Sequence, residues 1–102
     1  MSTNFGYVRV AAAVPHMRVA DCQYNANEIK KQITEAIEEG VQVVCFPELS
    51  ITGYTCADLF FTQQLQRDAL QALEQICAYT RNLHIIVLVG APLTVDNNLY
   101  NC

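Results

Sequence analysis

Short, nearly continuous apolar runs alternate along the chain with longer segments of mixed polarity. The apolar runs are Tyr7–Val14 (YVRVAAAV), Val41–Phe46 (VQVVCF) and His84–Val89 (HIIVLV). Runs of this length, rich in valine and isoleucine, are typical of β-strands, and an unbroken run is typical of a strand buried on both faces of a sheet. We therefore expect three strands here, with the second buried on both faces.

The segment after the first strand has apolar residues at helical spacing. These residues are Ala26, Ile29, Ile33, Ala36 and Ile37, with charged residues between them. Asn25 and Glu28 have the spacing of a capping box, and Gly40 stands where a glycine commonly ends a helix. The pattern predicts a helix from about Ala26 to Glu39.

A second helix is predicted after the loop at residues 47–57. Its apolar stripe consists of Leu65, Ala69, Leu73, Ile76 and Cys77. After the third strand, Val95–Leu99 has a turn-forming centre and predicts a hairpin tip. The order is β-α-β-α-β followed by the first arm of a hairpin, which indicates an α/β fold. Since Leu99–Cys102 leaves no room for a second arm, we expect the chain to be truncated inside a domain.

Composition and charge narrow the possible functions. Of the 102 residues, 52% are hydrophobic and 16% are charged, which is typical of one small folded domain. Six basic residues are scattered among ten acidic ones, so we expect neither a nucleic-acid surface nor an anionic-membrane surface. No apolar run approaches the roughly 20 residues of a membrane span. The N-terminus also lacks the basic region of a signal peptide, which predicts a cytoplasmic protein.

The five cysteines have no close pairing. They are Cys22, Cys45, Cys56, Cys77 and Cys102. An odd number at wide spacing fits neither a disulfide framework nor a zinc site, so we expect reduced, mostly buried thiols and no bound metal.

Candidate chemistry is concentrated in the stretch FPELSITGY (46–54), at the exit of the second strand. In an open α/β sheet, ligands gather at the carboxyl ends of strands, which is where Glu48 stands. Pro47 stiffens the path to Glu48, and aromatic neighbours could partly desolvate its carboxylate, as suits a general base. The alternative is a glutamate that faces water or caps the next turn.

Strand parity adds one constraint at this site. If the pleat continues, Val44, Phe46 and Glu48 share a face while Cys45 points the other way. Cys45 is therefore a poor candidate for a nucleophile activated by Glu48.

FPELSITGY resembles the first signature of the nitrilase, or carbon–nitrogen hydrolase, superfamily, and the order of strands and helices around it agrees. The resemblance implies an α-β-β-α sandwich, of which residues 1–102 would form a truncated N-terminal part. The segments GYTCADLFFTQQLQRDALQAL and VGAPLTVDNNLYN are similar to one branch, the glutaminase domains of bacterial glutamine-dependent NAD synthetases.

The resemblance also implies site residues. The family's catalytic set is Glu-Lys-Cys, and Glu48 matches its general base. The matching lysine and cysteine belong to later motifs, beyond the end of this chain, because Lys30, Lys31 and Cys102 do not stand in their places. Tyr54 matches a tyrosine that lines the glutamine pocket of the synthetase branch, although it could equally be a packed aromatic.

In that branch the full-length enzyme hydrolyses glutamine and uses the ammonia to amidate deamido-NAD in an ATP-dependent step. The resemblance thus implies glutamine, deamido-NAD and ATP with Mg²⁺ as partners of a full-length homo-oligomer. The ATP-dependent synthetase domain is absent from this chain, and no cofactor is expected in it. We expect residues 1–102 alone to be inactive, because a base without its nucleophile cannot attack an amide, and to be unstable or oligomeric.

Two alternatives remain open. One is a stand-alone amidase or nitrilase that acts on a small amide and shares Glu48. The other is a non-catalytic module that docks a partner through Leu59-Phe60-Phe61, although these residues could also belong to the core or to a subunit contact.

Overall fold

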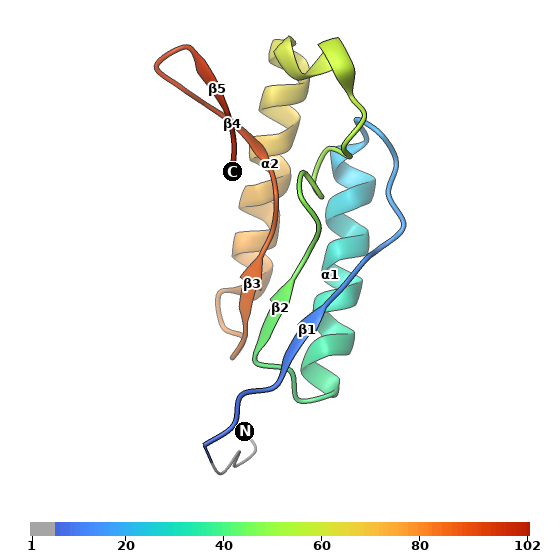
Figure 1. The fold of residues 1–102 in the computed structure, drawn as a ribbon, viewed down its shortest axis with the longest axis vertical. Coiled ribbons are helices and arrows are strands. Elements are labelled where there is room, and N and C mark those ends of the chain that lie inside the picture. Colours follow the sequence, from blue (N-terminus) through green and yellow to red (C-terminus); the bar gives the residue numbers. More distant parts are fainter. Residues whose placement is uncertain (1–5) are drawn as a thin grey trace.

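The computed structural model describes residues 6–102 and has the alternating order that the sequence predicts. Figure 1 shows three strands side by side, two long helices and a hairpin that projects beyond them. The elements in order are β1 (Val10–Ala12), α1 (Cys22–Glu38), β2 (Val43–Cys45), the 3₁₀ helix η1 (Ala57–Phe61), α2 (Gln63–Thr80), β3 (Ile86–Leu88), β4 (Pro92–Val95) and β5 (Asn98–Asn101). The α/β class is therefore confirmed, although the strands are shorter than the apolar runs that contain them.

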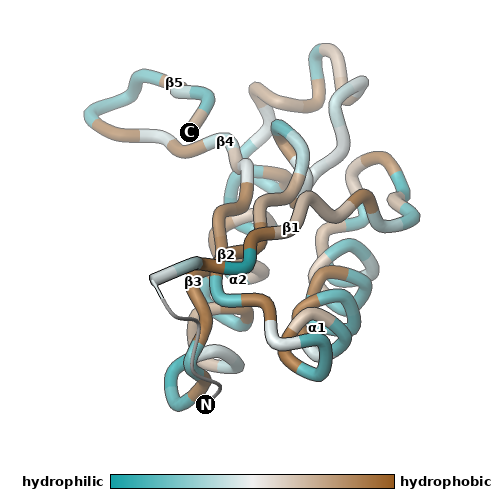
Figure 2. Tube along the Cα trace, turned by 60° about the horizontal axis from the view of Figure 1, so that its bottom comes forward, coloured by the Kyte–Doolittle hydropathy of each residue, from teal (hydrophilic) through white to brown (hydrophobic). Residues whose placement is uncertain are grey.

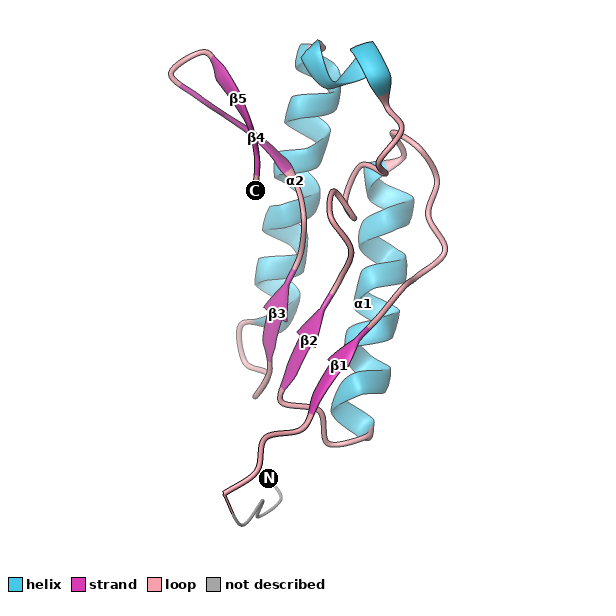
Figure 3. Cartoon of the chain, viewed as in Figure 1, coloured by secondary structure: helices cyan, strands magenta, loops and turns pink. Residues whose placement is uncertain are grey.

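The first three strands form a parallel sheet in the order β1-β2-β3, with Val43 paired to Val10 on one side and to Ile86 on the other. Each connection passes through a helix, and such crossovers are right-handed in nearly all proteins. Because the strand order does not reverse, both helices lie on the same face of the sheet, where they pack against each other (Figure 3). The three parallel strands and the two long helices thus form one helical layer on one sheet, and β4 and β5 form a separate two-stranded sheet.

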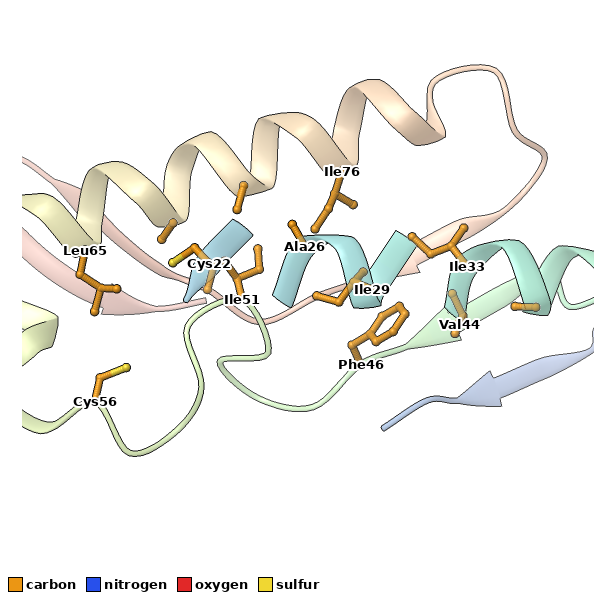
Figure 4. Close-up of a cluster of buried hydrophobic side chains, with 14 of the residues drawn as sticks. Cys22, Ala26, Ile29, Ile33, Val44, Phe46, Ile51, Cys56, Leu65 and Ile76 are labelled. Carbon is orange, nitrogen blue, oxygen red and sulfur yellow. The ribbon is translucent and has the colours of Figure 1, made fainter. Parts of the chain in front are cut away.

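The covered face of the sheet forms the core. Val44 and Phe46 are 0% and 5% exposed and lie beside Ile29 and Ile33 of α1 (Figure 4). Ile51, from the loop after β2, is also fully buried in this cluster. Burial of such side chains stabilises the fold by roughly 1.5–3 kcal/mol each.

The opposite face of the sheet is apolar but open. Val10, Ile86 and Leu88 are 66%, 61% and 51% exposed, and Cys45 is also exposed. Figure 2 shows the hydrophobic colouring of the three strands. The expectation that the second strand is buried on both faces is therefore wrong for residues 6–102, because none of these residues covers this side.

Helix α1 begins earlier than predicted. Its N-cap is Asp21, whose carboxylate accepts a hydrogen bond of 3.1 Å from the backbone N–H of Tyr24. The predicted capping box at Asn25 is wrong, because Asn25 lies inside the helix and is fully buried. Gly40 is confirmed as the terminating glycine, with a φ of 76°, since its N–H and that of Val41 bond back to the last turn in a Schellman motif.

Helix α2 is preceded by the 3₁₀ helix η1, which the sequence analysis did not predict. Thr62 then caps α2, because its hydroxyl accepts a hydrogen bond from the N–H of Leu65. The buried residues of α2 are Leu65, Ala69, Ala72 and Ile76. Cys77, predicted to lie on this stripe, is exposed, whereas Ala72, which was not predicted to lie on it, is buried.

The hairpin has both of its arms, so the expectation of a missing second arm is wrong. Strands β4 and β5 pair antiparallel, with Val95 opposite Asn98. Asp96 and Asn97 alone form the tip, with φ values of 50° and 65°, as a two-residue type I′ turn requires. The tip is shorter than the predicted one, which frees Asn98–Asn101 to form the second arm.

Two of the five cysteines are buried, Cys22 and Cys56, and the other three are exposed. The expectation of mostly buried thiols is therefore wrong. Burial, with a smaller contribution from Asp68, raises the pKa of the Cys22 thiol to about 11. The described part of the chain contains no helix that is long and apolar enough to cross a membrane.

Candidate functional site

The candidate site is the tight loop that leaves the sheet after β2. The N–H of Phe46 still bonds to Leu88 of the neighbouring strand, and the chain then turns on itself. Three backbone hydrogen bonds close the turn: the N–H of Ser50 donates to the carbonyl of Pro47 (3.1 Å), and the N–H groups of Thr52 and Gly53 donate to the carbonyl of Leu49 (3.2 and 2.8 Å). Leu49 has a φ of 52°, a conformation that costs a non-glycine residue energy and that clusters at functional sites.

Glu48 is the exposed residue of an otherwise buried turn. Ser50, Ile51 and Thr52 are each 0% exposed, and Leu49 is 8% exposed. Most loops lie on the surface, whereas the residues of this loop after Glu48 are buried in the core. The carboxylate of Glu48 is exposed to solvent. A carboxylate in this setting has a rigid base and free access to a reactant.

The structure confirms one prediction about the surroundings of Glu48 and differs from two others. The opposite orientation of Cys45 is confirmed, since Val44 is buried and Cys45 is exposed on the open face. The shared face of Glu48 with Val44 and Phe46 is wrong, because the turn ends the pleat before Glu48. The expected desolvation by aromatic neighbours is not seen among residues 6–102, where Glu48 is exposed.

Asn25 of α1 anchors the loop from below. Its side-chain amide donates hydrogen bonds to the carbonyls of Arg18 (2.8 Å) and Ile51 (2.9 Å), and its oxygen accepts one from the N–H of Arg18 (2.8 Å). The N–H of Ala20 adds a bond of 2.7 Å to the carbonyl of Thr52. These bonds satisfy polar groups that the buried loop would otherwise leave unpaired.

Gly90, just after β3, supports the loop from the side. Its N–H donates to the Ser50 hydroxyl (3.2 Å), and its carbonyl accepts from the N–H of Ile51 (3.1 Å). A Cβ at this position would lie 2.2 Å from the nitrogen of Leu49 and 2.9 Å from the carbonyl carbon of Glu48. The backbone of the turn therefore approaches so closely that only glycine fits.

Asn101 of β5 reaches the carboxylate itself. Its Nδ2 donates a hydrogen bond to Oε2 of Glu48. Beside this pair is an apolar hollow of about 210 Å³, which is lined by Leu49, Phe60, Phe61, Pro92, Leu99, Tyr100 and Asn101.

Tyr54 is 66% exposed and is not among the residues that line this hollow. The structure therefore does not bring Tyr54 together with Glu48, and its place in a substrate pocket stays a prediction. Leu59 and Phe61, also expected as core or contact residues, are 47% and 75% exposed, while the intervening Phe60 packs on the core.

Lys30 and Lys31 lie on α1, outside the residues that surround Glu48. Lys31 forms an ion pair of 3.0 Å with Glu28 on its own helix, and Lys30 lies over the ring of Tyr79. This placement agrees with the expectation that neither is the catalytic lysine. Cys102 exchanges backbone hydrogen bonds with Ala91 as a continuation of the hairpin.

The sequence analysis proposed Glu48 as a candidate but did not predict the residues that hold it and its loop in the structure: Asn25, Ser50, Gly90 and Asn101. One signal was available for Asn25, since an asparagine stands at helical spacing within an apolar stripe. No local signal marks Asn101, which is 53 residues from Glu48 in the sequence.

The sequence of residues 9–102 matches the model of the carbon-nitrogen hydrolase family. The chain belongs to the carbon–nitrogen hydrolase family. This confirms the resemblance and the nitrilase-type fold, of which the present sheet and its two helices are a part.

Within the family, the chain is similar to glutamine-dependent NAD(+) synthetases. It is 30% identical to that of Mycobacterium leprae over 100 residues, which are 98% of this chain and 15% of the relative. It is 37% identical to that of Aquifex aeolicus over 83 residues, which are 81% of this chain and 14% of the relative. This carbon–nitrogen hydrolase chain thus spans about one seventh of the length of these relatives.

The chain is also similar to solved structures, one of a synthetase and one of an amidase. The crystal structure of a glutamine-dependent NAD(+) synthetase from Cytophaga hutchinsonii superimposes with a TM-score of 0.86 at 34% identity, over 93% of this chain and 16% of that one. An amidase from Nesterenkonia sp. superimposes with a TM-score of 0.73 at 24% identity, over 83% of this chain and 32% of that one, which shows the shared fold.

Proposed function

We propose that these residues are the N-terminal part of the glutaminase domain of a glutamine-dependent NAD(+) synthetase. The observation that carries the proposal is the placement of Glu48. It is the exposed carboxylate of a rigid, buried loop at the carboxyl end of β2, in a chain whose family hydrolyses carbon–nitrogen bonds. The similarity to synthetases at 30–37% identity supports the choice of branch.

In the proposed reaction, Glu48 acts as general base toward a cysteine thiol. The thiolate attacks the side-chain amide carbon of glutamine, and a lysine stabilises the oxyanion that forms. The C–N bond then breaks, the nitrogen takes up a proton and leaves as ammonia, and water hydrolyses the resulting thioester to glutamate and free thiol. The lysine and the cysteine come from outside residues 1–102 in this scheme.

The other partners belong to the full-length enzyme. ATP and Mg²⁺ serve the synthetase domain, where deamido-NAD is amidated by the ammonia, and no step at Glu48 passes through them. Tyr54 lines the glutamine pocket in this proposal, once the rest of the domain has closed around it. The enzyme is proposed to be a cytoplasmic homo-oligomer.

The test is to change Glu48 to Gln in the full-length protein and to supply either glutamine or ammonia as nitrogen source. Glutamine hydrolysis and glutamine-dependent NAD synthesis should fall about a hundredfold or more, because a general base contributes roughly that factor. Ammonia-dependent synthesis should persist, because it bypasses the glutaminase step.

Glu74→Gln is the matched control, since Glu74 is an exposed glutamate of α2. This variant should keep both activities. A protein that hydrolyses small amides but makes no NAD from either nitrogen source would instead be a stand-alone hydrolase. Unchanged glutamine hydrolysis in Glu48→Gln would refute the general-base role. If this part of the protein were only an interaction module, the activity would not depend on Glu48.

A further inference from the structure

We propose that Asn101 is a positioning residue for Glu48, a role that rests on the proposed function of Glu48 as general base. The proposal follows from the hydrogen bond between Nδ2 of Asn101 and Oε2 of Glu48. Among residues 6–102, Asn101 is the side chain that binds this carboxylate, and the ion pairs of these residues do not include Glu48.

The bond matters because the carboxylate has little else to fix it. The backbone of the turn is rigid, but the Glu48 side chain is exposed, and an exposed glutamate samples several rotamers. A general base must lie within hydrogen-bond reach of the proton that it removes. A single donor that holds one carboxylate oxygen removes most of this freedom.

The hairpin delivers Asn101 to this place with a fixed register. Two backbone hydrogen bonds join Ala91 and Cys102 (2.9 and 3.0 Å), and Asn101 pairs with Pro92. This ladder begins directly after Gly90, whose backbone touches the Glu48–Leu49 turn. The backbone segments that carry Asn101 and Glu48 are therefore held against each other by direct backbone contacts.

An amide suits the task chemically. It is neutral and does not titrate near neutral pH, so it holds the carboxylate without competing for the proton. It occupies Oε2 and leaves Oε1 available to accept a proton from the thiol. A lysine or arginine in its place would pair with the charge and oppose proton uptake by the base.

The test uses the full-length enzyme with Asn101 changed to Leu, Gln or Asp. The Leu variant keeps the size and loses the donor, so kcat for glutamine hydrolysis should fall tenfold to a hundredfold with KM nearly unchanged. Gln restores an amide donor and should recover part of kcat. Asp has the same shape but repels the carboxylate, and should be the slowest of the three.

Asn98→Leu is the matched control, because Asn98 is an exposed asparagine on the same strand. Ammonia-dependent NAD synthesis and the melting temperature report whether each variant is folded, and the isosteric Asp variant carries the test if the Leu variant unfolds. A kcat of Asn101→Leu or Asn101→Asp within twofold of the wild-type value overturns the positioning role. An equal loss in Asn98→Leu overturns it as well, since it would show a merely structural effect.

Glu48→Gln, measured in parallel, separates this proposal from the one on which it rests. If Glu48→Gln is inactive and Asn101→Leu is normal, the positioning role alone has failed. If Glu48→Gln hydrolyses glutamine normally, the proposed function has failed, and the positioning role fails with it.

Discussion

At the scale of single residues, the site depends on how closely two backbone segments approach each other. Glu48 and Leu49 lie against Gly90, and the hydrogen bonds of Gly90 to Ser50 and Ile51 keep them there. The left-handed conformation of Leu49 is retained because these contacts surround it. The backbone that carries the carboxylate is thus held in place by a residue that has no side chain.

Changing Gly90 to Ala should therefore damage both stability and activity. The added Cβ would stand 2.2 Å from the nitrogen of Leu49, and backbone cannot move aside as a flexible side chain can. We expect a loss of roughly 3 kcal/mol, at the upper end for overpacking, and a large fall in glutamine hydrolysis. Thermal melting and the glutaminase rate measure the two effects.

Gly40→Ala is the control for this variant. Gly40 needs its positive φ, but a Cβ there would meet only the flexible side chain of Arg9, at 4.0 Å, which is an ordinary van der Waals contact. It should lose about 1 kcal/mol from the left-handed backbone and keep its glutaminase rate. If Gly90→Ala behaves like Gly40→Ala, close approach at Gly90 does not control the site.

At the scale of elements, α1 supports the loop that carries Glu48. Its apolar stripe packs under β2, and one polar residue within that stripe, Asn25, binds the carbonyl of Ile51 in the loop. The same amide binds Arg18 in the segment that leads into the helix. One side chain therefore joins helix, entry segment and loop.

Asn25→Leu tests whether the hydrogen bonds of Asn25 hold these three segments together. The substitution fits an apolar stripe, but it leaves the carbonyl of Ile51 and the N–H of Arg18 without this partner, at a cost of about 2–4 kcal/mol, while the carbonyl of Arg18 keeps its bond from the N–H of Asp21. We expect a clear drop in melting temperature of the full-length protein. Asn27→Leu, two residues along the same helix, is the comparison: Asn27 is exposed and bonds only within its helix, so the loss should stay within about 0.5 kcal/mol. Equal melting temperatures of the two variants would contradict the role of Asn25 in holding the helix, the entry segment and the loop together.

The elements that the sequence predicted are those with a local signal. Apolar periodicity located three strands and two helices, because each pattern reflects the covered face of its own element. The start of α1 was misplaced because Asp21 and Asn25 are both suitable caps, and only the packed structure directs Asn25 to Ile51. Glu48 could be proposed as a candidate from its place at the end of a strand, whereas the place of Asn101 depends on the hairpin register, which no local pattern reveals.

At the scale of the whole molecule, one face of the three-stranded sheet is left uncovered by residues 6–102. The helices cover one face of the sheet, and the other face presents the exposed apolar side chains of Val10, Ile86 and Leu88. A patch of this kind on a folded protein marks an interface. The α-β-β-α architecture of the family provides the partner, since its second sheet packs on this face.

This face predicts how residues 1–102 behave when they are produced alone. We expect them to self-associate through the open sheet and to release no ammonia from glutamine, since Glu48 would lack a nucleophile to activate. Leu88→Lys should shift the chain toward monomer in sedimentation experiments, because it places a charge on the open apolar face. Leu70→Lys is the matched control: Leu70 is 49% exposed on α2 and Leu88 is 51% exposed on β3, so only the location differs. If the unmodified chain is a monomer that melts sharply, or if both variants dissociate equally, the open face is not what drives association.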